Sequence, residues 1–224
     1  MSGTPKTTTV EATFVFADIA GFTALTEAHG DEAAVALVEE FAEAVCRDLP
    51  AIGGEHVKTI GDALMLRIPD PGDAIHLGLE VSQRTLRDHG SVPVRVGLHH
   101  GPAVERNGDY FGAAVNLAAR VSSAASGGEV LVSGSTAALV PELEGVVYES
   151  RGRHELRNVS ETIELFAVLR FDSTTERLPI DPVCRMAVDP DRAPGRLVHE
   201  GTAYFFCSLS CAGQFAGRPE RFSS

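Results

Sequence analysis

Basic residues are scarce in this sequence of 224 residues. It has 19 lysines and arginines against 31 aspartates and glutamates, which gives a formal net charge of −12. Non-specific binding to nucleic acid or to an anionic membrane needs basic patches, so this balance argues against both kinds of partner. It leaves room for a nucleotide site, because a few local cations can reverse the potential of one cleft. Clustered carboxylates instead indicate places where a divalent cation binds.

Long apolar runs are also missing. No stretch approaches the ~20 consecutive apolar residues that span a bilayer. At the N-terminus Glu11 and Asp18 bracket a short apolar run, and no basic-then-apolar leader is seen. We therefore expect a cytoplasmic protein without a membrane partner. The chain has only four cysteines, which we expect to be reduced thiols or metal ligands rather than disulfides in that compartment.

The spacing of apolar residues predicts an α+β fold. Strands are expected at residues 9–18, 55–59, 63–68, 92–99, 129–133, 146–150 and 162–169, and helices at 31–48, 73–88 and 113–124. A helix is also expected to start just after the first strand. This order is typical of helices packed on a mainly antiparallel sheet, in a ferredoxin-like or palm-like sandwich.

Composition divides the chain into four parts. Residues 1–8 are small and polar and are expected to form a flexible tail, followed by a main domain over 9–171. The polar stretch 172–177 is typical of a linker. Residues 178–224 then hold three of the four cysteines, which predicts a separate small module.

Two aspartates each lie beside a glycine at the end of a predicted strand. Asp18 precedes the turn at Gly21, and Asp62 follows Gly61 at a hairpin tip. Backbone N–H groups at a helix start bind phosphate, so the residues after Asp18 are candidates for substrate binding: Ile19, Gly21, Phe22 and Thr23. Two neighbouring carboxylates can share two magnesium ions during phosphoryl transfer. Taken singly, Asp18 is as readily a helix cap and Asp62 a turn residue.

Two further pairs of polar residues suit nucleotide chemistry. Asn116 and Arg120 lie four residues apart and share a helix face, where an Arg can stabilise phosphate charge and an Asn can orient a ribose. On an arbitrary helix, both residues more often face water. Lys58 and Asp109 would match the acceptor N1 and the amino group N6 of adenine, whereas guanine presents the opposite pattern.

These residues, in this order, resemble the class III nucleotide cyclase family. The blocks that match are FVFADIAGFT, GEHVKTIGDALM, VRVGLHHGPAV and GDYFGAAVNLAARV, between residues 9 and 169. The resemblance implies two metal-binding aspartates at Asp18 and Asp62, which would hold two Mg²⁺ or Mn²⁺ ions per site. It further implies an ATP-selecting pair at Lys58 and Asp109, a ribose-orienting residue at Asn116 and a transition-state residue at Arg120.

In this family the active site lies between two chains. A single chain that holds the whole set therefore implies a head-to-tail homodimer with two equivalent sites, each converting ATP to cyclic AMP and pyrophosphate. One departure concerns the triphosphate. Many relatives have a second basic residue in the late hairpin, where this sequence offers only Arg153 or Arg157.

The C-terminal module resembles the YHS domain, a small module found with metal-handling proteins. Its motifs include DPVCRM and YFFCSLSC, between residues 178 and 222. Cys207 and Cys211 lie one helical turn apart, Cys184 can approach them from a loop, and His199 is a possible fourth ligand. Thiolates suit Zn²⁺ or another soft transition metal, which would help so small a core to fold. The alternative is that these cysteines pack as small buried hydrophobes.

Three functions remain open from the sequence. The first is an adenylate cyclase tuned by the C-terminal module. The second is a metal-binding or metal-sensing protein whose cyclase domain mainly dimerises. The third is another phosphoryl-transfer enzyme on a palm-like fold. The complete set of six residues favours the first, because a scaffold needs none of them.

Overall fold

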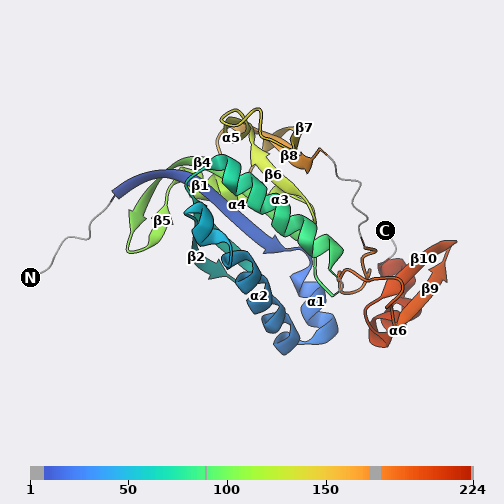
Figure 1. The fold of residues 1–224 in the computed structure, drawn as a ribbon. Helices are drawn as coiled ribbons and strands as arrows, with labels where there is room; N and C mark the ends of the chain where they lie inside the picture. Colours follow the sequence, from blue (N-terminus) through green and yellow to red (C-terminus); the bar gives the residue numbers. More distant parts are fainter. Residues whose placement is uncertain (1–7, 89, 172–177, 223–224) are drawn as a thin grey trace, which may run out of the picture.

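One twisted eight-stranded sheet organises the main domain (Figure 1). The computed structural model describes residues 8–88, 90–171 and 178–222. The strand order is β2-β3-β1-β4-β6-β8-β7, and β5 pairs with β4. The strands are β1 (Thr8–Ile19), β2 (Glu55–Ile60), β3 (Ala63–Ile68), β4 (Val94–Arg106), β5 (Asp109–Phe111), β6 (Val130–Ser133), β7 (Val146–Glu155) and β8 (Thr162–Arg170). Only β4 and β6 pair in parallel among the described strands, so the predicted α+β fold with a mainly antiparallel sheet is confirmed.

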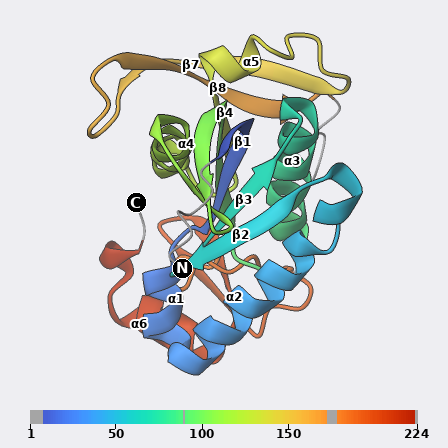
Figure 2. The ribbon, with the colours of Figure 1, turned by 90° about the vertical axis from the view of Figure 1, so that its left-hand side faces the viewer.

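Helices cover both faces of this sheet. Figure 2 shows α3 and α4 on opposite sides of the central strands, with α1 and α2 near one end of them. The helices are α1 (Phe22–His29), α2 (Asp31–Cys46), α3 (Pro71–Arg87), α4 (Ala113–Ala124) and the short α5 (Gly134–Ala137), with a 3₁₀ turn at Leu49–Ile52. The buried residues of α2 and α3 join the strands in one apolar cluster, and those of α4 join them in a second on the opposite face.

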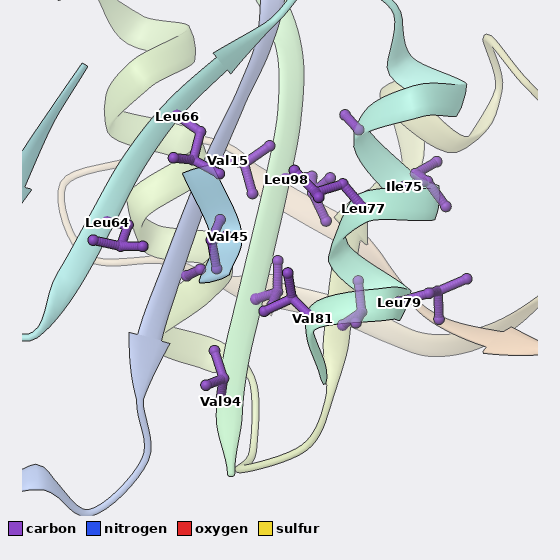
Figure 3. Packing of buried hydrophobic residues seen from close by; sticks show 14 of the residues in the cluster. Val15, Val45, Leu64, Leu66, Ile75, Leu77, Leu79, Val81, Val94 and Leu98 are labelled. Atoms are coloured by element: carbon purple, nitrogen blue, oxygen red, sulfur yellow. The ribbon is translucent and has the colours of Figure 1, made fainter. Parts of the chain in front are cut away.

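Strand β1 is buried on both faces because its side chains alternate between two cores. Val15 and Ile19 join the cluster formed with α2 and α3, part of which Figure 3 shows from close by. Phe14 and Phe16 join a second cluster with α4. A strand between two helical layers needs apolar residues at nearly every position, which explains the continuous apolar run in the sequence.

Helix α4 passes very close to strand β4 at Gly97. A Cβ atom built on Gly97 would lie 1.9 Å from the backbone nitrogen of Ser122 in α4. Only a residue without a side chain fits there. This contact sets the distance between the helix and the sheet, and so the height of α4 above the strands.

The structure differs from the sequence prediction at strands β4 and β5. Strand β4 continues to Arg106, beyond the predicted end at residue 99. It is paired by β5, where the sequence predicted a loop. Among the helices within the described ranges, none combines the length and the apolar character that crossing a bilayer would need.

The C-terminal module consists of β9 (Gly195–His199), β10 (Thr202–Phe206), α6 (Leu209–Gly217) and a 3₁₀ turn at Pro219–Arg221. In Figures 1 and 2 it lies beside α1. Backbone hydrogen bonds join it to the main domain, with Ala187 donating to Ser91 at 2.7 Å and accepting from Gly90 at 2.9 Å. The predicted linker 172–177 and nearly all of the predicted tail 1–8 lie outside the described residues.

We expect Gly97→Ala to lower the free energy of unfolding by on the order of 3 kcal/mol, because α4 must move away from β4. Chemical denaturation followed by circular dichroism measures this. The matched control is Gly213→Ala in α6, where a Cβ meets nothing within 4 Å. Equal stability of the two variants would contradict the close approach.

Candidate active site and a cysteine cluster

Strand register brings Asp18 and Asp62 together. Asp18 lies opposite Ala63 of β3 on one side and opposite Arg95 of β4 on the other. Asp62 directly precedes Ala63, in the two-residue turn that joins β2 to β3. Gly61 has φ 64° there, as the first residue of such a tight hairpin turn often requires. The two carboxylates therefore lie side by side at one end of the sheet.

The two carboxylates lie close enough for each to affect the charge of the other. Burial, and after it the nearby charge of Asp18, together raise the pKa of Asp62 to about 6. Arg95 balances part of this charge, because its Nε donates to Asp18 Oδ2 at 2.7 Å and a second nitrogen also contacts that oxygen. Two carboxylates in contact, with one needing a proton, fit a site for hard divalent cations.

Arg95 was not predicted from the sequence as part of this site. The signal for it lay in strand order, since only the pairing of β4 with β1 places it opposite Asp18. The Arg95 guanidinium contributes a positive charge directly beside the Asp18 carboxylate. Its side chain is 36% exposed, so the ion pair is open to solvent.

The chain after Asp18 forms the predicted turn into a helix. Ile19 is the last residue of β1, and its side chain is buried in the core, so only its backbone can meet a ligand. Gly21 has φ 88° and precedes α1, whose first residues are Phe22 and Thr23. The first backbone N–H groups of a helix have no partner within it, which suits a phosphate.

Lys58 of β2 and Asp109 of β5 contact each other. The Lys58 ammonium donates to both carboxylate oxygens of Asp109, at 2.7 and 2.6 Å. This hydrogen bond lowers the pKa of Asp109. The predicted base-reading pair is thus brought together, with both side chains about one-third exposed at 38% and 31%.

Asn116 and Arg120 lie on α4, as predicted. Asn116 is exposed and Arg120 is half-buried. Within the described ranges, neither side chain has a hydrogen bond or ion pair to another residue. In the late hairpin, Arg153 is already bonded to Thr162, at 2.8 Å to its hydroxyl, while Arg157 is exposed. Of the two basic residues considered for the triphosphate, Arg157 is the one not held across the hairpin.

A separate cluster gathers the three cysteines of the C-terminal module. Cys207 Sγ lies 3.3 Å from Cys184 Sγ and 3.7 Å from Cys211 Sγ. The fourth member is His29, the last residue of α1, and not the predicted His199. His199 instead packs edge-on against Phe215, with ring centroids 6.0 Å apart. No local sequence pattern points to His29, because it lies in the other domain.

A buried carboxylate organises the cysteine-bearing loops. Asp181, fully buried, accepts hydrogen bonds from the backbone N–H groups of Val183 at 2.8 Å and Cys207 at 2.9 Å. Ser208 caps α6 by accepting from the Cys211 backbone at 3.1 Å. The pKa of Cys211 is lowered because the thiols of Cys184 and Cys207 hydrogen-bond to its sulfur. The thiols are free cysteines.

Comparison with known families gives two matches. The model of the adenylate and guanylate cyclase catalytic domain matches residues 4–169. The model of the YHS domain matches residues 180–224. The first match covers the sheet, both helical layers and all six residues singled out above.

Named relatives support the first match. A pH-sensitive adenylate cyclase of Mycobacterium tuberculosis is 36% identical over 172 residues, which is 75% of this chain and 43% of that protein. An adenylate cyclase of Streptomyces coelicolor is 41% identical over 118 residues, 52% of this chain and 31% of that protein. The chain thus spans less than half the length of either relative. The crystal structure of the adenylyl cyclase CyaB from P. aeruginosa has a TM-score of 0.66 at 22% identity, over 76% of this chain and all of that one.

The carboxylate pair predicts a pH-dependent effect on stability. Because the folded pKa of Asp62 is raised to about 6 from its usual 3.8, its contribution to stability is present below pH 4 and is lost as pH rises through 6. In protein freed of Mg²⁺ and Mn²⁺, Asp62→Asn should raise the melting temperature at pH 8 and bring little gain near pH 4.5. Thermal melts at both pH values measure this, with Glu39→Gln on the exposed side of α2 as control. A gain independent of pH would contradict the coupling.

Proposed function

We propose that this chain, which belongs to the adenylate and guanylate cyclase catalytic domain family, converts ATP to 3′,5′-cyclic AMP and pyrophosphate. The main support is the placement of Asp18 and Asp62 side by side at the ends of neighbouring strands, because two adjacent carboxylates are suitable ligands for divalent cations. The enzyme would thus be a phosphorus–oxygen lyase. Its product, cyclic AMP, is a diffusible second messenger, so the reaction would serve intracellular signal transduction.

The reaction requires one displacement at phosphorus. The ribose 3′-oxygen forms a bond to the α-phosphorus, the bond from that phosphorus to the bridging oxygen breaks, and pyrophosphate leaves. The hydroxyl proton is released to solvent or to the leaving group. When bound by Asp18 and Asp62, two Mg²⁺ or Mn²⁺ ions would supply activation of the attacking oxygen and stabilisation of the leaving one. The start of α1, at Gly21 and Phe22, would receive the triphosphate.

The other residues act on the nucleotide by position and charge. Arg120 would hydrogen-bond the α-phosphate oxygens, where negative charge grows in the transition state. Asn116 would orient the ribose, so that its 3′-oxygen is in line with the bond that breaks. Lys58 would donate to adenine N1 while Asp109 accepts from N6. On binding, the adenine would separate these two side chains and replace the hydrogen bonds that they now make to each other.

Each active site would be shared between two copies of the chain in a head-to-tail homodimer. Asn116 and Arg120 support this, because within the described ranges neither is bonded to Asp18 or Asp62, so both remain available to a nucleotide held by a second copy. Two large apolar side chains next to the base-reading pair are also exposed, Ile60 at 51% and Phe111 at 51%. A second copy would cover them and close two equivalent sites at once.

A second candidate function is metal sensing, in which the cyclase domain mainly dimerises. The observation that favours it is the cluster of one histidine and three cysteines, which spans both domains. The first candidate accounts for six further residues that a sensor does not need. We therefore place the cyclase reaction first and treat the cluster as a part of the same enzyme.

The test is the conversion of ATP by the purified chain with Mn²⁺ or Mg²⁺, measured as cyclic AMP. We expect Asp62→Asn to lower the rate at least about 100-fold, because the cations lose a ligand that acts in the transition state. Glu39→Gln should leave the rate unchanged. Product formation by Asp62→Asn at the rate of the unmodified chain would overturn the metal assignment.

Mixing two inactive variants tests the shared site. If Asp62→Asn and Arg120→Ala lie on opposite sides of each site, a mixed dimer holds one intact site and one with both defects. An equal mixture should then recover about one quarter of the original activity, because half of the dimers are mixed and each has one working site. If size and mass measurements show mixed dimers but no activity returns, both residues of a site would come from the same chain, and the shared site would be wrong.

Base selection predicts a change in the preference for ATP over GTP. Lys58→Glu should lower the ratio of kcat/KM for ATP to that for GTP by at least about tenfold, because a carboxylate accepts from guanine and repels adenine N1. Lys58→Met is the control, since it removes the donor without adding an acceptor and should slow ATP conversion without helping GTP. An unchanged ratio in Lys58→Glu would remove the base-reading role.

A further inference from the structure

The cluster of His29 with the three cysteines has the dimensions of a tetrahedral metal site. All four ligand atoms lie within 4.8 Å of one another. His29 Nε2 lies 3.4 Å from Cys207 Sγ and 3.9 Å from Cys211 Sγ. Zinc–sulfur bonds of about 2.3 Å and zinc–nitrogen bonds of about 2.0 Å give tetrahedral edges of about 3.8 and 3.6 Å. The sulfur–sulfur distances of 3.3 and 3.7 Å are slightly shorter than the first value, and the sulfur–nitrogen distances of 3.4 and 3.9 Å lie on either side of the second.

Simple packing of small hydrophobes does not explain this cluster. Such packing needs no imidazole nitrogen, yet His29 turns Nε2 towards two sulfur atoms. A disulfide is no better explanation, because it would bring two sulfurs to about 2.05 Å, and the cysteines are free. Three thiolates and one imidazole are, in contrast, a common ligand set of structural zinc.

We propose that His29 and the three cysteines together bind one zinc-class ion, which ties helix α1 of the cyclase domain to the C-terminal module. The module alone supplies three ligands, and the fourth comes from the domain that we assign to catalysis. Docking of the module supports the assignment. Ala28, next to His29, packs against the core of the module, and Arg221 approaches Glu27 at 3.8 Å.

The module also touches the other end of α1. The side chain of Arg185, next to the ligand Cys184, lies against Gly21, where a built Cβ would meet Arg185 Cγ at 2.6 Å. The module therefore contacts α1 at both ends: at Gly21, which precedes its first residue, and at Ala28 and His29 in its last turn. An ion at His29 therefore restrains the helix that begins just after Asp18. The importance of this restraint for catalysis rests on the proposed cyclase function, whereas the metal site does not.

Metal binding by the full chain tests the site without any measurement of activity. After dialysis that removes Mg²⁺ and Mn²⁺, we expect one Zn²⁺ per chain by elemental analysis, and Co²⁺ in its place should show thiolate charge-transfer bands and the visible bands of tetrahedral cobalt. His29→Ala should lower Zn²⁺ affinity at least about tenfold in competition with a chelator. His199→Ala is the matched control and should bind as the unmodified chain does.

Further variants and outcomes keep the test decisive. His29→Cys retains four ligands, so it should restore affinity and add charge-transfer intensity even if His29→Ala folds poorly. Unchanged affinity and spectrum in His29→Ala would overturn the proposal, because the ion would then belong to the module alone. A chain that holds no metal, with its thiols reduced or joined in a disulfide, would overturn it as well.

Hydrogen exchange tests the tie to α1. Adding Zn²⁺ to the metal-free chain should slow amide exchange in peptides that cover residues 20–29, and His29→Ala should show no such slowing. Zinc binding without any change in these peptides would overturn the tie. If the cyclase assay fails while zinc binding and exchange behave as expected, the proposed reaction is wrong and the inter-domain site stands.

Discussion

The register of strand β1 is the constraint on which the candidate active site depends. Its side chains alternate between two cores, so a slip of one residue would exchange every buried position with one on the opposite face. Burial of Phe14 and Val15 in different cores holds this register. Asp18 is thereby placed next to Ala63 and Arg95 and beside the hairpin turn of Asp62. Apolar packing thus holds two carboxyl groups next to each other, although their mutual repulsion when both are ionised opposes this arrangement.

Much of the fold follows from the sequence, because long apolar patterns decide it. Helix α4 was predicted with the ends that the structure shows. The bounds predicted for β2 and β3 differ from the observed ones by a single residue, at the end of β2. Strand β5 was missed because three residues, Asp109–Phe111, are too few to show a pattern. The closeness of Asp18 and Asp62 could be expected, because each follows or joins a predicted strand and such strands were expected to be neighbours. Lys58 and Asp109 were proposed together from the hydrogen-bonding pattern of adenine, but their direct contact was not predicted, since it depends on how β5 folds back on β4.

The fourth ligand of the cysteine cluster shows where sequence reasoning fails. Within the module, His199 was the nearest histidine and a reasonable choice. The structure turns it towards Phe215 and brings in His29, which lies 178 residues from Cys207 along the chain. No spacing rule links residues so distant, because their approach depends on docking through Ala187 and Ser91. A site shared between domains becomes visible only when both are folded together.

The buried carboxylate of Asp181 affects the entropy cost of binding an ion at this cluster. Its carboxylate fastens the loop before Cys184 to the backbone of Cys207, so the sulfur atoms are gathered by the protein's own hydrogen bonds. The entropy of ordering these two ligand segments is therefore lost during folding and not at the moment of capture. A set of ligands ordered in this way before an ion binds would favour ions whose size and coordination geometry match the existing arrangement.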